Sequence, residues 1–204
     1  MAPIASRSIW LDRFPDLVSR WFHRQPEALK TELISPRNVQ ERVERRVHRM
    51  LEIGKLTPRY IPQSVREWET KWQIRVYWKE IVAKLNEVNC DVIRHDTQST
   101  DHDVSMSALH ESERDSLVLV EEALETITEF CRSEGLDIPL TTNDVALIAC
   151  AREYYTRLAQ RAGNAPRPWV DEIAAPTFAQ YAFGFPFNPL VIELLEAEKQ
   201  KAQQ

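Results

Sequence analysis

The sequence contains only four glycines among its 204 residues, against twelve prolines. Glycine-rich phosphate loops and chains of tight hairpins need more flexible backbone than four glycines supply, so the composition disfavours both. The chain also lacks any run of about eighteen apolar residues, the length that a membrane-spanning helix needs. Its longest apolar stretches, such as Val145–Ala151, have the length of a buried helix face. The composition likewise excludes collagen-like, disulfide-framework and strongly disordered classes of protein.

Cysteine is also scarce, with three residues set far apart at Cys90, Cys131 and Cys150. An odd number without a Cys-x-x-Cys pair predicts neither a disulfide framework nor a zinc site. Each cysteine lies in an apolar helical pattern, so we expect reduced, buried thiols and a cytoplasmic protein. Residues 1–8 are short and mixed in polarity, which predicts no secretory signal.

The sequence signatures of catalysis are missing as well. Metal-bridging helical bundles need Glu-x-x-His pairs, and the nearest approach, Glu44 with His48, is one residue too long. Neither a His-Glu-x-x-His motif, a Gly-x-Ser-x-Gly motif nor a phosphate loop is present. The histidines and acids around His95 and His102 lack the regular spacing of zinc ligands. We therefore expect no metal, no cofactor and no catalytic residues.

Helical spacing of apolar residues dominates the segments between the prolines and glycines. This pattern predicts an all-α fold, an irregular bundle of six or seven helices in a single domain, 1–204, without a sheet. One helix is expected to begin after the cap Ser35 and to end at Gly54. Two longer, heptad-like helices are expected at 64–93 and 112–134.

Two segments are expected to be irregular. Residues 173–188 are rich in aromatic side chains but are interrupted by Pro176, Gly184 and Pro186, which predicts a broken segment that wraps over the bundle. Residues 95–111 are polar and lack periodicity, which predicts a mobile loop.

The net charge of −5 conceals a division between the two parts of the chain. Residues 1–84 hold 17 Lys and Arg against 10 Asp and Glu, a balance of +7, whereas residues 85–204 hold 9 against 21, a balance of −12. A chain with a basic and an acidic half suits head-to-tail contact between copies, and equally a basic groove for an anionic partner.

Four arginines, Arg42, Arg45, Arg46 and Arg49, recur at i, i+3, i+4 and i+7 in one predicted helix. This spacing predicts four guanidinium groups on one side of the helix, opposite its valines. Such a row can bind the phosphates of a nucleic acid or an acidic protein surface. The alternative is a solvated face with local pairs, since Glu41 precedes Arg45 by four residues.

An acidic cluster lies on the second heptad-like helix, opposite its apolar stripe. Its members are Glu121, Glu122, Glu125 and Glu129. Paired carboxylates act as acid and base only when they face a pocket, so this spacing predicts a solvated helix face.

Two groups of aromatic residues are candidate protein interfaces. The first, on adjoining faces of one predicted helix, comprises Trp68, Trp72 and Trp78. A single neighbouring helix cannot cover all three rings, so either two helices flank them or one face binds a partner. The second, in the broken C-terminal segment, comprises Phe183, Phe185 and Phe187. That segment is either a lid on the core or an arm that docks on a second copy.

The two long apolar stripes and the missing catalytic motifs favour a non-enzymatic protein that assembles with itself or with a helical partner. The alternative is a nucleic-acid-associated structural protein, such as a coat or packaging component, with the four arginines on the phosphates. An enzyme with a small-molecule pocket among Trp72, Trp78, Tyr154 and Tyr155 is a third alternative. No association with a membrane is expected.

Overall fold

The computed structural model describes residues 13–59, 61, 74–95, 116–134, 140–163, 168–185 and 187–202. This part of the chain is mostly helical, as the sequence predicts, with eight helices rather than six or seven. The helices are α1 (Phe14–Arg24), α2 (Glu27–Leu33), α3 (Pro36–Ile53), α5 (Ile74–Glu87), α6 (Glu121–Ser133), α7 (Thr142–Arg161), α8 (Pro168–Phe183) and α9 (Leu190–Ala202). The two strands are β1 (Asp91–His95) and β2 (Ser116–Val120).

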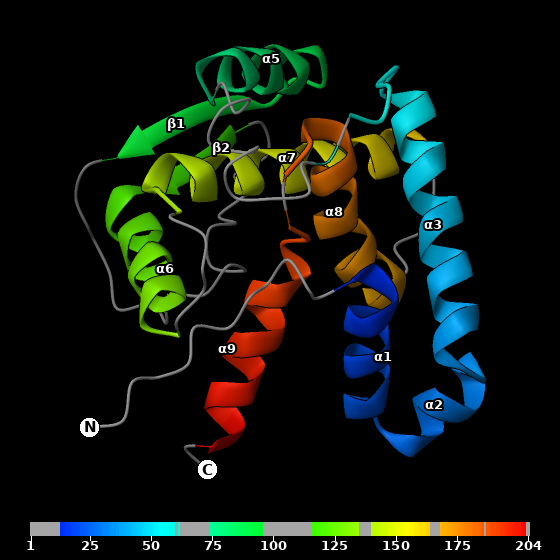
Figure 1. Cartoon of the computed structure of the whole chain (residues 1–204). Helices are drawn as coiled ribbons and strands as arrows, with labels where there is room; N and C mark the ends of the chain where they lie inside the picture. Colours follow the sequence, from blue (N-terminus) through cyan, green and yellow to red (C-terminus); the bar gives the residue numbers. More distant parts are fainter. Residues whose placement is uncertain are drawn as a thin grey trace.

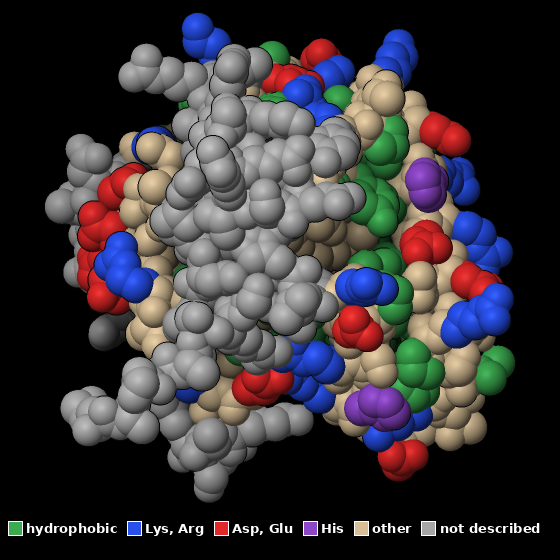
Figure 2. Space-filling view, in the orientation of Figure 1, with side chains coloured by type: hydrophobic (Ala, Val, Ile, Leu, Met, Phe, Trp, Pro, Cys, Tyr) green, Lys and Arg blue, Asp and Glu red, His purple; other side chains and the backbone are tan. Residues whose placement is uncertain are grey.

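Helix α7 occupies the centre of the fold, with α8, α5, α6 and α3 packed around it (Figure 1). Every residue of Val145–Ala151 is buried, so this part of α7 has no solvent face and is covered from several sides. Helices α3 and α6 consequently lie on opposite sides of the molecule (Figure 1). The edge formed by α3 carries Lys and Arg side chains among acidic ones, and the edge formed by α6 carries mostly acidic side chains (Figure 2).

Helix α3 begins and ends where the sequence predicts. The Ser35 hydroxyl accepts a hydrogen bond from the Asn38 N–H at 3.3 Å, and Pro36 occupies the first turn, where its missing N–H costs little. The side of α3 that faces α8 is fully buried and is lined by Val39, Val43 and Val47. The helix ends at Gly54, where a Cβ atom would lie 3.0 Å from Leu158 Cδ1, so a larger residue there would need the Leu158 side chain of α7 to shift.

The structure contains a small sheet, which corrects the prediction of a bundle without one. Strands β1 and β2 pair in parallel, in register from Asp91 with Ser116 to His95 with Val120. Buried and half-buried side chains alternate along β2, the pattern of a strand with one covered face. Leu117 and Val120 of β2 also continue the 3–4 spacing of the apolar residues of α6, which is why periodicity predicts a helix there.

Both heptad-like helices are therefore shorter than predicted. Helix α5 ends at Glu87, and Asn89 then has a φ of 55°, a left-handed conformation that asparagine tolerates. Helix α6 begins only at Glu121, directly after β2. Of the predicted loop at 95–111, His95 is the last residue of β1 and the others lie outside the described part.

The aromatic C-terminal segment is largely helical, which corrects the prediction of an irregular segment. Helix α8 continues through Pro176, although a proline removes one backbone hydrogen bond from a helix. Next to it, the Thr177 hydroxyl donates to the Ile173 carbonyl at 2.8 Å and accepts from Asn188 Nδ2 at 3.0 Å, so buried polar groups stay paired. Gly184, with a φ of 67°, ends the helix in the left-handed conformation that glycine adopts without strain.

Candidate interaction surface

Three of the four predicted arginines form a row on the solvent side of α3. Arg45 and Arg49 are exposed and Arg42 is half-buried, whereas the valine side of the helix is buried. At 100° per residue these three positions span an arc of about 60°, which contains no Asp or Glu of the helix. We call Arg42, Arg45 and Arg49 the arginine row.

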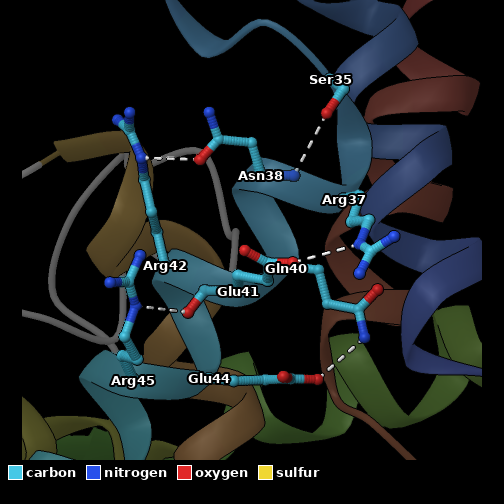
Figure 3. A network of polar contacts seen from close by, with 8 residues as sticks. All are labelled: Ser35, Arg37, Asn38, Gln40, Glu41, Arg42, Glu44 and Arg45. Carbon is cyan, nitrogen blue, oxygen red and sulfur yellow. Dashed lines mark hydrogen bonds and ion pairs between the residues drawn. The ribbon is translucent and has the colours of Figure 1, made fainter.

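Two members of the arginine row are held by residues one turn earlier in α3. Arg42 Nε donates to Asn38 Oδ1 at 3.1 Å, and Arg45 Nε donates to the Glu41 carbonyl oxygen at 3.1 Å. Figure 3 shows both guanidinium groups on the same side of the helix. Because these bonds use only Nε, the donors of the terminal nitrogens remain for a partner.

The acidic side chains near the arginine row are bonded to other residues (Figure 3). The Glu41 carboxylate accepts from Arg37 Nε at 3.1 Å, and the Glu44 carboxylate accepts from Gln40 Nε2 at 2.8 Å. Arg45 thus reaches the predicted residue, Glu41, but bonds to its backbone carbonyl and not to its carboxylate. The charge of the row is therefore not cancelled by direct contact with these carboxylates.

Helix α8 places an aromatic ring beside the arginine row. The guanidinium carbon of Arg42 lies 5.7 Å from the ring centroid of Trp169, within the range of a cation–π contact. Trp169 is half-buried, and its ring centroid lies 6.3 Å from that of Trp21. The sequence gives no signal for this neighbour, because Trp169 is far along the chain and approaches Arg42 only through the packing of α8 on α3.

Arg46 is not part of the row, contrary to the prediction. Its side chain is only 9% exposed, and its Nε donates to Tyr155 Oη and to Asp171 Oδ1, both at 3.2 Å. Tyr155 Oη in turn donates to Asp171 Oδ1 at 2.6 Å. Arg46 lies about 20° around the helix from Val39, so it borders the buried side of α3. The position of Arg46 relative to the valines could therefore have indicated that its side chain is buried.

The three side chains form an ion pair with a bridging hydroxyl that joins α3, α7 and α8. Burial lowers the pKa of Arg46, but the hydrogen bonds and electrostatic attraction of Tyr155 and Asp171 outweigh burial and raise that pKa. Burial, followed by the hydrogen bond to Asp171, raises the pKa of Tyr155. Arg46 is thus charged and Tyr155 protonated at neutral pH, which indicates a structural link. The Arg46 Nη2 atom is buried without a hydrogen-bond partner.

The turn between α2 and α3 exposes an apolar side chain on a strained backbone. Ile34 has a φ of 72° and a ψ of −53°, and the Ser35 N–H donates to the Leu33 carbonyl at 2.8 Å. This geometry is the rare form of γ-turn with a positive φ at its central residue. For a β-branched residue such a conformation costs about 1–3 kcal/mol. The Ile34 side chain is 74% exposed, more than any other large apolar side chain in the described residues.

Helix α6 presents carboxylates on the side of the molecule away from α3. Glu122, Glu125 and Glu129 are exposed, and the apolar residues of the helix pack inwards. We call these three residues the acidic side of α6. Arg132 is the one basic residue of the helix, and its Nη1 lies 3.2 Å from Glu129 Oε2. Figures 1 and 2 show α6 at the left edge of the molecule and α3 at the right edge.

Of the two predicted aromatic interfaces, the C-terminal one is buried, and Trp78, the described member of the other, is half-buried. The aromatic residues of the C-terminal segment are 0%, 1% and 3% exposed, in the order Phe183, Phe185 and Phe187. These rings fill the core of the chain, so they cannot meet a partner unless that core opens. Trp78 is half-buried, with the guanidinium carbon of Arg94 4.9 Å from its ring centroid. Trp68 and Trp72 lie outside the described residues.

A second, half-buried ion pair joins α7 to α9, and no spacing in the sequence indicates it. Arg152 Nη1 contacts Glu193 Oε1, and Glu196 follows one turn later in α9. Burial raises the pKa of Glu193, although Arg152 opposes the shift. Burial, together with the negative charge of Glu193, raises the pKa of Glu196 to about 7. Arg152 therefore contacts the carboxylate of Glu193 and attracts that of Glu196 through its charge.

The three cysteines are free and buried, as the sequence predicts: Cys90, Cys131 and Cys150. Burial raises the pKa of all three thiols, that of Cys131 to about 12, so they are protonated at neutral pH. Within the described ranges, no group of three or more His, Cys, Asp or Glu side chains is placed to hold a metal ion. No helix in the same ranges has the length and hydropathy needed to cross a bilayer.

Comparisons of this chain with protein-family models, with curated proteins and with solved structures find no match.

We expect Asp171→Ala to lower the free energy of unfolding by about 2–4 kcal/mol, because it leaves the buried Arg46 guanidinium without its carboxylate. The loss should be smaller than for a fully buried pair, since the Asp171 side chain is 25% exposed. Denaturation by urea measures the change. The exposed Glu125→Ala serves as a control and should change stability by less than about 0.5 kcal/mol. A loss for Asp171→Ala as small as that of the control would contradict the assignment.

The raised pKa of Glu196 predicts a stability that depends on pH. The folded chain holds the Glu196 proton up to about pH 7, whereas an ordinary glutamate loses it near 4.5. Between these values the folded state binds more protons than the unfolded state, so this contribution to stability is full at low pH and falls as the pH rises towards 7. We expect Glu196→Gln to match the parent chain near pH 5 and to be more stable than it at pH 8. Thermal unfolding at both pH values tests this, and an equal difference at the two would contradict it.

Proposed function

We propose that this protein is a non-enzymatic interaction protein that associates with copies of itself, head to tail. The arginine row of one copy would contact the acidic side of α6 of the next copy. The observation that carries this proposal is the placement of α3 and α6, the helices that carry these two surfaces, on opposite sides of the molecule (Figures 1 and 2). Complementary surfaces placed in this way favour a heterologous contact, which joins two different surfaces of neighbouring copies. An open assembly of this kind has a free arginine row at one end and a free acidic side of α6 at the other.

The expected strength of the contact follows from the exposure of its charges. Exposed ion pairs contribute about 0–1 kcal/mol each, and salt screens them over about 8–10 Å. The arginine row and the acidic side of α6 are therefore expected to orient the two copies and to raise the association rate, and to contribute less to the affinity. Self-association should be weak at physiological salt, and it should need an apolar contact beside the charges.

Charge reversal tests the proposed contact. We expect R45E/R49E and E125K/E129K each to weaken self-association, because each variant places like charges on the two facing surfaces. A mixture of the two variants should associate again, because the reversed row of one then meets the reversed α6 of the other. Light scattering over a wide range of protein concentration, at low and high salt, measures the assembly.

Thermal unfolding of both reversal variants provides the control for folding, and only small shifts are expected because all four side chains are exposed. A parent chain that stays monomeric at every concentration, or a mixture that associates no better than its components, would contradict the proposal.

A second candidate function, binding of single-stranded nucleic acid, is favoured by one observation. Trp169 lies beside Arg42, so a ring on which a base can stack accompanies side chains that bind phosphates. Arg46 takes no part, because its guanidinium is bonded to Asp171 inside the protein.

Fluorescence anisotropy with a labelled single-stranded oligonucleotide at two salt concentrations tests this candidate. R42Q/R45Q/R49Q should bind at least about tenfold more weakly and with a smaller salt dependence, and Trp169→Ala should weaken binding without changing the salt dependence. Arg37→Gln, which removes an 88% exposed arginine paired with Glu41 in the same helix, is the matched control and should bind like the parent. Absence of salt-sensitive binding in the parent chain would exclude the function.

A further inference from the structure

The exposed side chain of Ile34 is not explained by the packing of a single chain. Its neighbour in the turn, Leu33, is 1% exposed and belongs to the core, whereas Ile34 is 74% exposed. An exposed isoleucine contributes almost nothing to the hydrophobic stabilisation of its own chain. The only other large apolar side chains exposed among the described residues, Ile53 and Ile93, are each 39% exposed.

The backbone at Ile34 makes the residue type still less expected. The turn needs a positive φ, which glycine adopts freely and asparagine adopts with little strain. A β-branched side chain is the least suitable choice for this conformation. Strain of this kind is typically retained where a side chain has a role that the turn alone does not require. The chain thus holds an apolar side chain outward at a position where a simpler residue would form the same turn.

Ile34 stands at the beginning of the helix that carries the arginine row. One residue separates it from Pro36, the first residue of α3, so a partner lying along this helix can reach it. The opposite surface also offers an apolar side chain. Ile93 of β1 pairs in register with Val118, three residues before α6 begins at Glu121. Ile34 thus lies on the turn that leads into α3, and Ile93 lies in the sheet whose second strand leads into α6.

We infer that Ile34 is the apolar anchor of the head-to-tail contact, and that it packs against the surface beside α6 of a second copy. This inference rests on the proposed self-association, for which the charged side chains alone supply little affinity. In protein interfaces a few buried side chains contribute most of the binding free energy, although they cover little of the interface area. Ile34 would have this role beside the charged side chains. The strained turn keeps the Ile34 side chain directed outward before the partner arrives, so little conformational freedom is lost on binding.

The substitution Ile34→Gly separates the two roles of this residue, because it should affect folding and association in opposite directions. Glycine relieves the strain of a positive φ, so the variant should unfold at the same temperature as the parent chain or at a higher one. The same change removes the anchor, so self-association should weaken by about tenfold or more. Ile34→Leu keeps an apolar side chain and should associate within about threefold of the parent, as expected for a volume-conserving apolar exchange.

Lys55→Gly is the matched control. Lys55 is exposed, lies just beyond the other end of α3 and also has a positive φ, 52°. Its replacement by glycine should leave self-association unchanged. Sedimentation velocity over a range of concentrations measures association, and thermal unfolding at low concentration measures the stability of the monomer.

The outcomes separate this inference from the proposed function. If R45E/R49E loses self-association and Ile34→Gly associates as strongly as the parent, the contact through the arginine row is supported and the role of Ile34 as its anchor is contradicted. If the parent chain does not associate at any concentration, the proposed function fails and this inference fails with it. Weakened association of Ile34→Gly with an undiminished unfolding temperature supports the anchor.

Discussion

The ion pair between Arg46 and Asp171 is the contact on which the outer surface of this protein depends. The valines on the buried side of α3 recur every four residues, so a slide of one turn against α8 would place one valine where another had been. Such a slide would move Arg46 away from both Asp171 and Tyr155, and in one direction it would bring Met50 to the place of Arg46. The pair thus favours the observed position and rotation of α3, and with them the outward direction of the arginine row. A buried ion pair of this kind is better understood as a determinant of register than as a source of stability.

The central helix α7 separates the basic and the acidic parts of the chain on the surface of the molecule. Because α7 is buried on several sides, a helix from the basic half of the chain and a helix from the acidic half are packed on different flanks. The net charge of −5 is therefore the sum of basic and acidic regions that are separated in space. Such separation orients approaching molecules, whereas affinity has to come from apolar contact. The exposed isoleucine at the beginning of α3 supplies the missing element in this account.

Much of the fold could be predicted from local chemistry. The cap at Ser35 and the four-residue spacing of the valines define most of α3, because each acts through near neighbours in the sequence. The sheet could not be predicted in this way, since the five residues of β2 match a strand and part of a helical stripe equally well. Helix α8 was missed for a different reason: Pro176 breaks helices in isolation, and only the surrounding core keeps this one continuous.

The candidate surface was predictable in part. Three of the four arginines face solvent, and the fourth differs because its position borders the valine side of the helix. Trp169 beside Arg42 depends on the packing of two distant helices, and the conformation of Ile34 depends on the path of the chain between α2 and α3. Neither leaves a pattern in the order of residues, so no inspection of the sequence alone would have found them.

Disulfide trapping between two differently labelled copies, one carrying Arg49→Cys and the other Glu125→Cys, tests the head-to-tail contact directly. The native cysteines are buried, so the introduced thiols are the accessible ones. A specific contact between α3 and α6 predicts a mixed disulfide-linked dimer that forms faster than either homodimer and faster than a pair made with Arg37→Cys in place of Arg49→Cys. Equal rates for all of these pairs would contradict a specific contact between α3 and α6.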